Sequence, residues 1–178
     1  MEMVLDGQPG AFETLVTPYR RSLLGLAFRL TGNEEDAKEA AQEALLRAFR
    51  YLRSFDPAQS FRNWLLRILV NAVRRAGHTD RPAVGLEDAP VAVEPSPGPA
   101  ARYQAKELRA RLTDCLGVLG QREREVFLLR DIEDRSIKET AEILGSSSVA
   151  VRVNLSSARK KIKAEMLRRY PGFLGEER

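Results

Sequence analysis

Ser136 to Lys161 reads SIKETAEILGSSSVAVRVNLSSARKK, a pattern that is typical of two short helices joined by a tight turn. Gly145 stands where the first helix must stop, because glycine tolerates the left-handed backbone that ends many helices. Ser147 and Ser148 follow as candidate N-caps of the second helix. The apolar residues of the first helix recur on one face at helical spacing: Ile137, Ala141 and Leu144. The pattern predicts a helix-turn-helix, a motif whose second helix can enter the major groove of DNA.

The second helix of this motif is predicted to have an apolar stripe and a basic outer face. The stripe consists of Val151, Leu155, Ala158 and Ile162. Between Ser148 and Arg169, Glu165 is the only acid among many Lys and Arg residues. The solvated edge of a helical bundle would also be polar, but the caps and the charge imbalance favour DNA binding. The outer face carries Arg152, Asn154, Ser156, Ser157, Arg159 and Lys160.

Composition limits the kinds of site that the chain can hold. The 178 residues carry a formal net charge of +4 at pH 7 and include one cysteine and one histidine. These two residues cannot form a disulfide framework or a Cys/His zinc site, so we expect no metal and no cofactor. Cys115 lies on an apolar helical stripe, where a lone cysteine is usually a small core residue.

Nothing in the sequence indicates export, membrane insertion or catalysis. The N-terminus lacks a basic-then-apolar signal segment, and Arg67 and Asn71 interrupt the longest apolar run. We therefore expect a soluble, cytoplasmic protein. His78 is isolated, and no group of nucleophile, base and oxyanion donors stands out, so we also expect that the protein is not an enzyme.

The N-terminal part of the chain predicts three helices. Apolar spacing indicates one helix over residues 11–30 and a second from Asn33, its N-cap, to about Ser54. The second helix has acids in its first turn, where the helix dipole favours them, and becomes basic and apolar in its second half. A third helix is expected from Phe61 to about Ala76, with Ser60 placed to cap it.

Trp64 of the third helix stands among arginine and asparagine residues. A tryptophan in such a setting can pack in the core behind solvated arginines, or it can offer its ring to a nucleic acid base. The sequence leaves both interpretations open.

Residues 77–101 differ in kind from the helices on either side. They are rich in proline and glycine, carry more acids than basic residues and have no sustained periodicity, which predicts an extended linker. After the linker, helices are expected over residues 102–119 and 121–130, before the helix-turn-helix. The expected fold is therefore all-α, with two small helical domains (residues 1–76 and 102–178) joined by the linker.

Four motifs, in this order, resemble one family. They are DAKEAAQE at 36–43, SFRNWL at 60–65, REREVFLLR at 122–130, and AEILG at 141–145 followed by basic residues at 152 and 159–161. Together they cover nearly all of both predicted domains. The chain resembles the bacterial RNA polymerase sigma factors of the extracytoplasmic-function (ECF) class, within the sigma-70 family. The resemblance implies a promoter-specificity subunit that binds core RNA polymerase, recognises the −35 and −10 promoter elements and helps to open the DNA.

The resemblance also implies a role for each set of residues. The first domain would bind the β′ clamp helices of the polymerase through Asp36, Glu39, Gln42 and Glu43. Its third helix and the loop before it would hold the −10 strand through Ser60, Arg62, Asn63, Trp64, Arg67, Asn71 and Arg74. The helix-turn-helix would read the −35 duplex with Ser148, Arg152, Val153, Asn154, Ser156, Ser157, Arg159 and Lys160. The resemblance also implies two further partners, the β flap of core polymerase and an anti-sigma factor. The anti-sigma factor could hold the protein near the membrane.

Two other functions remain as alternatives. A free-standing helix-turn-helix regulator would not need an acidic helix beside a helix rich in Trp, Arg and Asn. A sigma-like decoy or interaction protein would not need the basic groups on the third and last helices. A nucleotide hydrolase is more remote, since the chain has no phosphate-binding glycine loop. The recognition helix departs from the family pattern at Ser146, Val153-Asn154 and Ser156-Ser157, so the sequence does not predict a promoter.

Overall fold

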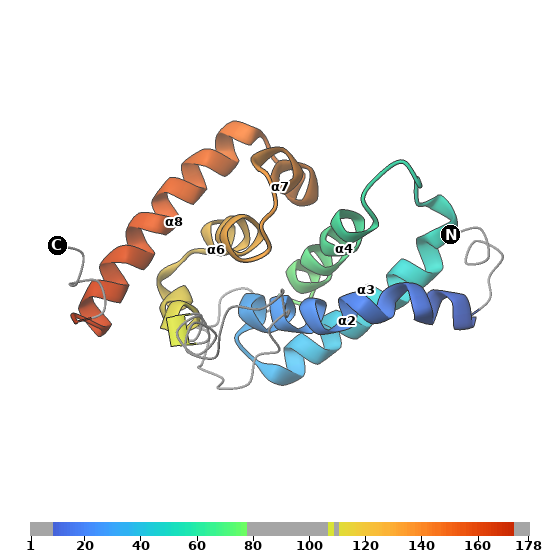
Figure 1. Cartoon of the computed structure of the whole chain (residues 1–178), viewed down its shortest axis with the longest axis horizontal. Coiled ribbons are helices and arrows are strands. Elements are labelled where there is room, and N and C mark those ends of the chain that lie inside the picture. The colour runs from blue at the N-terminus through green and yellow to red at the C-terminus, as the bar shows by residue number, and fades with distance from the viewer. Residues whose placement is uncertain (1–8, 78–106, 109–110, 173–178) are drawn as a thin grey trace, which may run out of the picture.

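The computed structural model describes residues 9–77, 107–108 and 111–172, and every regular element in these ranges is a helix. The all-α prediction is therefore confirmed for this part of the chain. Nearly all of the predicted linker lies outside the described residues. Figure 1 shows α2, α3 and α4 as one group of helices and α6, α7 and α8 as another. We call residues 9–77 the N-terminal half and the described residues from 107 onward the C-terminal half.

The N-terminal half is built from α2 (Pro9–Thr31), α3 (Glu34–Tyr51) and α4 (Phe61–Arg75). The side chain of Asn33 caps α3 as predicted, since its Oδ1 accepts the backbone N–H groups of Glu35 and Asp36 at 2.8 and 3.1 Å. The helix ends in the 3-10 turn Leu52–Ser54. Small residues on its inner face let it approach its neighbours closely: Ala37, Ala40, Ala41, Ala44 and Ala48.

An aromatic cluster holds the loop before α4. The rings of Phe55 and Trp64 lie 5.0 Å apart between centroids, and those of Phe55 and Phe61 lie 5.4 Å apart. Ser60 caps α4, because its Oγ accepts the N–H of Asn63 at 3.3 Å. The cluster and the cap together fix where the polar side chains of α4 begin.

The C-terminal half contains α6 (Gln121–Phe127), α7 (Ile137–Leu144) and α8 (Ser148–Arg169). Before α6, residues 111–115 are helical and continue into the 3-10 turn Leu116–Val118. The single helix expected over residues 121–130 is instead α6 followed by a π-helical segment, Leu128–Ile132, whose wide turn is closed by a hydrogen bond from the Glu133 N–H to the Leu128 carbonyl.

The helix-turn-helix is present as predicted. Gly145 ends α7 with φ of 60°, in the left-handed region, and Ser147 caps α8 by accepting the Ala150 N–H at 3.1 Å. Ser136 and Glu139 form a capping box at the start of α7. Of the two serines considered as caps for α8, Ser147 takes this role.

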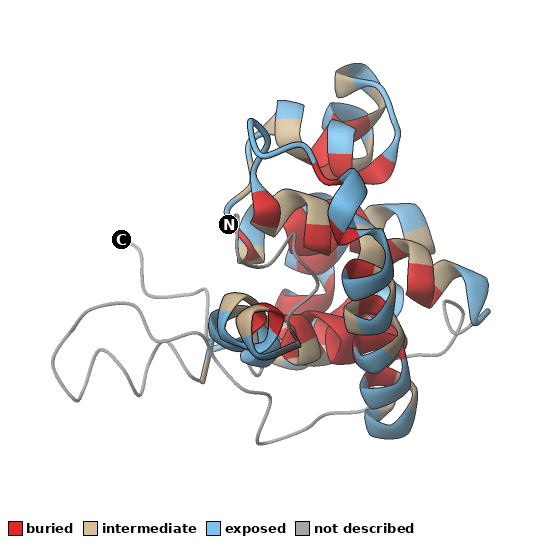
Figure 2. Cartoon of the chain, turned by 90° about the vertical axis from the view of Figure 1, so that its right-hand side faces the viewer, coloured by how far each residue is buried: buried red, intermediate tan, exposed pale blue. Residues whose placement is uncertain are grey.

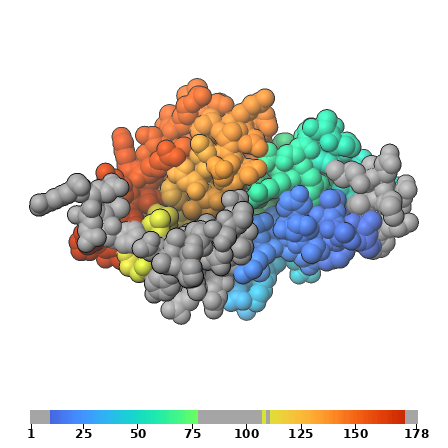
Figure 3. Space-filling model, viewed as in Figure 1, coloured from blue at the N-terminus to red at the C-terminus, as the bar shows by residue number. Residues whose placement is uncertain are grey.

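The two halves pack directly on one another, with α4 against α7. Figure 2 shows buried residues running through the interior of both halves, and Figure 3 shows the α4 surface meeting the surface of the C-terminal half. Arg124 of α6 is 4% exposed and donates to the carbonyl of Leu30, at the end of α2, at 3.3 Å. None of the described helices combines the length and the hydropathy that a membrane span needs.

Candidate nucleic-acid and polymerase interfaces

Glu123 of α6 fixes the position of α8. Its carboxylate accepts hydrogen bonds from Ser157 Oγ at 2.6 Å, Lys161 Nζ at 2.7 Å and the Gly120 N–H at 2.9 Å. Burial by itself would raise the pKa of Glu123, but the hydrogen bonds from Lys161 and Ser157 outweigh it and lower the pKa. Glu123 is thus held in its charged form, and it ties the middle of α8 to the first turn of α6.

The residues predicted to contact the −35 element differ in exposure and in the hydrogen bonds that they already make within the chain. Arg159 makes a bidentate pair with Asp131, at 2.8 and 2.6 Å, and this hydrogen bonding raises its pKa. Ser157 is bound to Glu123, and Asn154 donates to the Ala150 carbonyl at 2.8 Å. Ser148 is half-buried at the start of α8. Arg152, Val153, Ser156 and Lys160 are exposed, and Arg159 is exposed as well despite its pair with Asp131.

Val149 is an exposed residue of α8 that the sequence analysis did not include. Its side chain is 67% exposed, and Val153, one turn later, is 63% exposed. Apolar groups on a recognition helix can contact the methyl group of thymine in the major groove. Two exposed valines spaced by one turn, off the apolar stripe, are a signal that could have identified Val149.

A cleft of about 500 Å³ lies beside α4. Ala58, Gln59, Ser60, Asn63, Trp64 and Arg67 line it on one side, and Glu142 and Ile143 of α7 line it on the other. Trp64 is half-buried, so it both packs in the aromatic cluster and lines the cleft. Ala58 and Gln59 were not among the predicted site residues, although the loop that carries them was.

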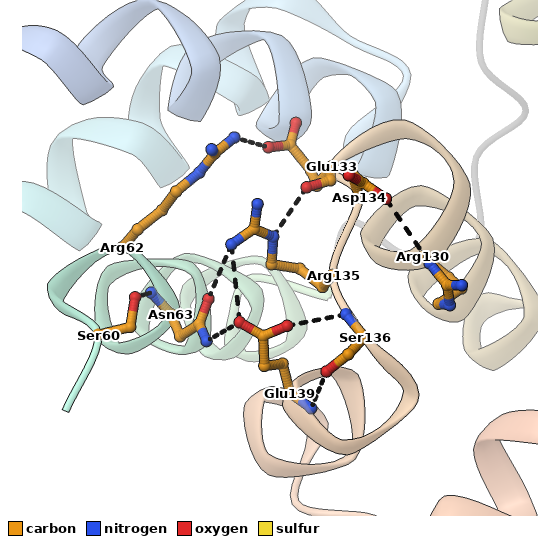
Figure 4. A network of polar contacts seen from close by, with 9 residues as sticks. All are labelled: Ser60, Arg62, Asn63, Arg130, Glu133, Asp134, Arg135, Ser136 and Glu139. Atoms are coloured by element: carbon orange, nitrogen blue, oxygen red, sulfur yellow. Dashed lines mark hydrogen bonds and ion pairs between the residues drawn. The ribbon is translucent and has the colours of Figure 1, made fainter.

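Three of the residues predicted to contact the −10 strand are bound to acids of the C-terminal half. Arg62 pairs with Glu133 at 2.9 Å, and Asn63 Nδ2 donates to Glu139 Oε1 at 2.8 Å (Figure 4). Arg74 makes a bidentate pair with Glu125 at 2.8 and 2.6 Å. Of the remaining members, Arg67 is exposed and Asn71 is half-buried.

Glu139 is the most strongly perturbed carboxylate of this region. The hydrogen bond from Asn63 and those from the backbone and side chain of Ser136 lower its pKa to about 2. Arg135 also lies near it, with Nη1 3.7 Å from the carboxylate. Glu139 is therefore fully ionised at neutral pH.

The residues predicted to bind the polymerase lie along α3. Glu39 and Gln42 are exposed, Asp36 is half-buried, and Glu43 pairs with Arg47 one turn later. Beside them is a groove of about 660 Å³ between α2 and α3, which combines Lys38 and Gln42 with apolar residues. Its apolar lining includes Phe12, Leu24, Ala41, Leu45, Leu46 and Phe49.

The apolar part of this groove was missed in the sequence analysis. Leu46 is 46% exposed and Phe49 is 42% exposed, which is unusual for such large apolar side chains. The signal is the pattern of Leu46 and Phe49, three positions apart, which forms a second apolar stripe beside the alanine-rich inner face of α3. The surface offered by α3 is therefore part acidic and part apolar.

Comparison with known families identifies the chain. The family model described as Sigma-70 region 2 matches residues 15–78, and the one described as Sigma-70, region 4 matches residues 109–162. The RNA polymerase sigma factor CnrH of Cupriavidus metallidurans is 32% identical over 168 residues, which cover 89% of this chain and 88% of CnrH. The chain belongs to the sigma-70 family, in its ECF class.

Other relatives of this ECF sigma factor are longer. The probable RNA polymerase sigma factor RfaY of Xanthomonas campestris pv. campestris is 34% identical over 170 residues, covering 92% of this chain and 42% of RfaY. The ECF RNA polymerase sigma factor SigG of Mycobacterium tuberculosis is 32% identical over 182 residues, covering 89% of this chain and 49% of SigG. The chain thus spans less than half the length of these two relatives.

The fold of this sigma factor also matches a solved structure. The structure of CnrH in complex with the cytosolic domain of CnrY aligns with a TM-score of 0.67 and 28% identity, and the alignment covers 93% of each chain. Because the alignment spans both halves, the two-part helical architecture of the sigma factor is shared with CnrH.

Proposed function

We propose that this ECF sigma factor is a promoter-specificity subunit that binds core RNA polymerase, recognises the −35 and −10 promoter elements and helps to open DNA. One observation carries the proposal: a single chain combines an exposed basic recognition helix, a polar cleft backed by an aromatic ring, and an acidic-apolar helix face. A free-standing regulator would use only the first of these surfaces. Proteins of this family are initiation factors and not enzymes.

We assign residues 1–76 to core binding and to the −10 element, residues 77–101 to a linker, and residues 102–178 to the −35 element. The acids of α3 would bind the positively charged clamp helices of β′, and the neighbouring groove would receive apolar side chains. The proposed core-binding residues are Asp36, Glu39, Gln42, Glu43, Leu46 and Phe49.

We assign strand opening to α4 and its cleft. A cleft of about 500 Å³ can hold an unstacked base, and the half-buried Trp64 that lines it offers an aromatic ring for stacking. The exposed guanidinium of Arg67 would bind the backbone phosphate. Asn71 would supply donor and acceptor groups further along the helix.

We assign reading of the −35 duplex to α8. Arg152 lies in the part of a recognition helix that reaches base edges, and Lys160 lies two turns later, where the helix meets phosphates. The bidentate pair with Asp131 limits Arg159 to orienting the helix unless DNA displaces the carboxylate. The exposed valines of α8 would contact thymine methyl groups.

We further infer an anti-sigma partner in the cytoplasm. CnrH, which aligns over both halves, was solved with the cytosolic domain of CnrY. If the anti-sigma partner of this chain were attached to the membrane, it would hold the sigma factor there until it released it. The β flap is the expected second contact on core polymerase.

In vitro transcription with core polymerase tests the proposal. The template should carry the DNA upstream of the chain's own gene, and we expect a discrete transcript that depends on the chain. A decoy would bind core polymerase without producing a transcript. A free-standing regulator would protect duplex DNA without core polymerase. Either result would contradict the proposed function.

A further inference from the structure

We infer that α8 selects its −35 element by the 5-methyl groups of two pyrimidines, so that 5-methylcytosine can take the place of thymine in the promoters of this sigma factor. The inference rests on the proposed function and names the chemical feature of duplex DNA that the recognition helix selects. Two exposed valines of α8, Val149 and Val153, carry it.

The two valines lie on the side of α8 that points away from the core. Val149 precedes the buried Val151 by two positions and Val153 follows it by two, which places both about 160° from Val151 around the helix. The same outward line continues through Ser156 and Lys160, both exposed, at intervals of three and four residues. Figure 1 shows α8 along the outer edge of the C-terminal half, with α6 on its inner side. The first two turns of α8 therefore present an apolar ridge to whatever binds there.

The charge around this ridge indicates that its partner is DNA. Val149 and Val153 are the two most exposed large apolar side chains in the part of the chain that the structure describes. The exposed charged residues beside them are all basic, and α8 carries no acid from Ser148 to Lys163. The DNA major groove combines phosphates at its edges with methyl groups on its floor, so it complements both features.

Hydrogen-bonding groups contribute little to the middle of this face. Asparagine can recognise adenine through both groups of its amide, but Asn154 donates its amide nitrogen to the Ala150 carbonyl at 2.8 Å. The side chains that remain at the middle of the outward face are Val149, Val153 and Ser156. Because serine can bond to any of the bases, selection at the centre of the contact falls to the two valines.

A valine side chain distinguishes bases by the methyl group alone. Thymine is the only one of the four bases with a methyl group in the major groove, and 5-methylcytosine carries its methyl group on the same ring carbon. Burial of one methyl group should strengthen binding about fourfold, and burial of two about fifteenfold. Val149 and Val153 are separated by a rise of about 6 Å along the helix, so the two methyl groups should belong to base pairs about two steps apart.

The first experiment finds the element. Holoenzyme selects duplexes that carry the DNA upstream of the chain's own gene with the −35 region randomised. We expect the parent to enrich thymine at two positions about two base pairs apart. The variant Val149→Ala, Val153→Ala should form holoenzyme normally, because neither side chain is buried, and should lose the enrichment at these two positions.

The second experiment changes single methyl groups on the selected promoter. Replacement of each of the two thymines by deoxyuridine removes only the methyl group and should weaken holoenzyme binding about fourfold. A cytosine at the same position should bind about fourfold more tightly once it is methylated at C5. The valine variant should show neither difference. Leu167→Ala, which removes an exposed apolar side chain from the far end of α8, is the matched control and should show both.

Two results would overturn the inference. The parent holoenzyme could bind the thymine and deoxyuridine promoters equally, in which case the ridge faces a protein partner. The valine variant could keep the full difference, in which case another part of the chain senses the methyl group.

Failure of the inference can be told apart from failure of the proposed function, because the same duplexes are also bound by the chain alone and transcribed by the holoenzyme. If transcription starts from the selected promoter but ignores the methyl groups, the inference is wrong and the sigma function stands. If the chain alone prefers the methylated duplexes but gives no transcript with core polymerase, the methyl preference stands and the proposed function is wrong.

Discussion

Asn63 Nδ2 donates a hydrogen bond to Glu139 Oε1 at 2.8 Å, across 76 positions of sequence. The same carboxylate accepts the Ser136 N–H at 2.8 Å and so completes the capping box of α7. One side chain therefore both starts the first helix of the helix-turn-helix and joins that helix to α4. Its ionisation should affect the stability of the whole chain.

Glu139→Gln should show this effect in its pH dependence. Because the pKa of Glu139 is lowered from 4.5 to about 2, its ionised form stabilises the fold above pH 4.5, and this contribution is lost as the pH falls towards 2. The side chain is about one-third exposed, so we expect Glu139→Gln to lower the free energy of unfolding by at most about 1 kcal/mol at pH 7. Urea denaturation at pH 7, 4.5, 3 and 2 measures the difference. If Glu139→Gln lowers the free energy of unfolding by as much at pH 2 as at pH 7, the loss does not come from the ionised carboxylate of Glu139, and the prediction is wrong.

Gly145→Ala should destabilise the C-terminal half only because alanine is strained in the left-handed backbone conformation of residue 145. The residue has φ of +60°, and a Cβ added there would meet no atom within 4 Å. We expect Gly145→Ala to cost about 1 kcal/mol of unfolding free energy. Gly145→Asn should cost less, because asparagine tolerates this conformation. Chemical denaturation measures both, and equal costs would show that something other than backbone strain is responsible.

Glu39→Lys should weaken binding to core polymerase without unfolding the chain. Glu39 is exposed on α3, so its reversal disturbs no core contact. Loss of a charge pair at an interface costs about 2–5 kcal/mol when the pair is buried and less at the rim. Glu35→Lys, also exposed on α3, is the matched control. Fluorescence anisotropy with labelled protein measures the affinity, and equal effects of the two variants would remove Glu39 from the interface.

Arg67→Ala should reduce promoter opening while leaving the melting temperature unchanged. Arg67 is exposed on the cleft, and its removal takes away a phosphate contact of the opened strand. Arg75→Ala, at the exposed end of α4, is the control. Asn71→Ala is expected to act like Arg67→Ala. Opening is scored by the chemical reactivity of unpaired thymines in the holoenzyme–promoter complex. A lower melting temperature with normal opening would give these residues a structural role only.

Arg152→Ala and Lys160→Ala should affect promoter binding in different ways. Arg152→Ala should cost about 1–3 kcal/mol and relax the preference at one or two base pairs, as expected for a base-reading arginine. Lys160→Ala should weaken binding to all promoter variants alike and reduce the log–log salt slope by about one. Holoenzyme binding to promoter variants at several salt concentrations measures both effects. If Arg152→Ala weakens every variant equally, Arg152 binds phosphate, and our placement of α8 in the groove is wrong.

The sequence by itself determined the helices, their ends and the family. The caps at Asn33 and Ser60 and the stop at Gly145 depend on hydrogen bonds and backbone angles within a few residues of each end, so a local pattern is sufficient to predict them. The motifs of the two sigma regions are likewise contiguous in the chain. The wide π-helical turn after α6 is the exception, because no local signal distinguishes it from continued α-helix.

Only the tertiary structure decided which polar side chains are free. Arg159 and Lys160 are adjacent in sequence and look alike, but Arg159 is bound to Asp131, 28 positions away, and Lys160 is exposed. Arg62 and Arg74 likewise find their acids 71 and 51 positions away. The physical reason is that a charged side chain takes its partner from whichever element the hydrophobic packing brings beside it, and that packing depends on the apolar faces of both halves at once.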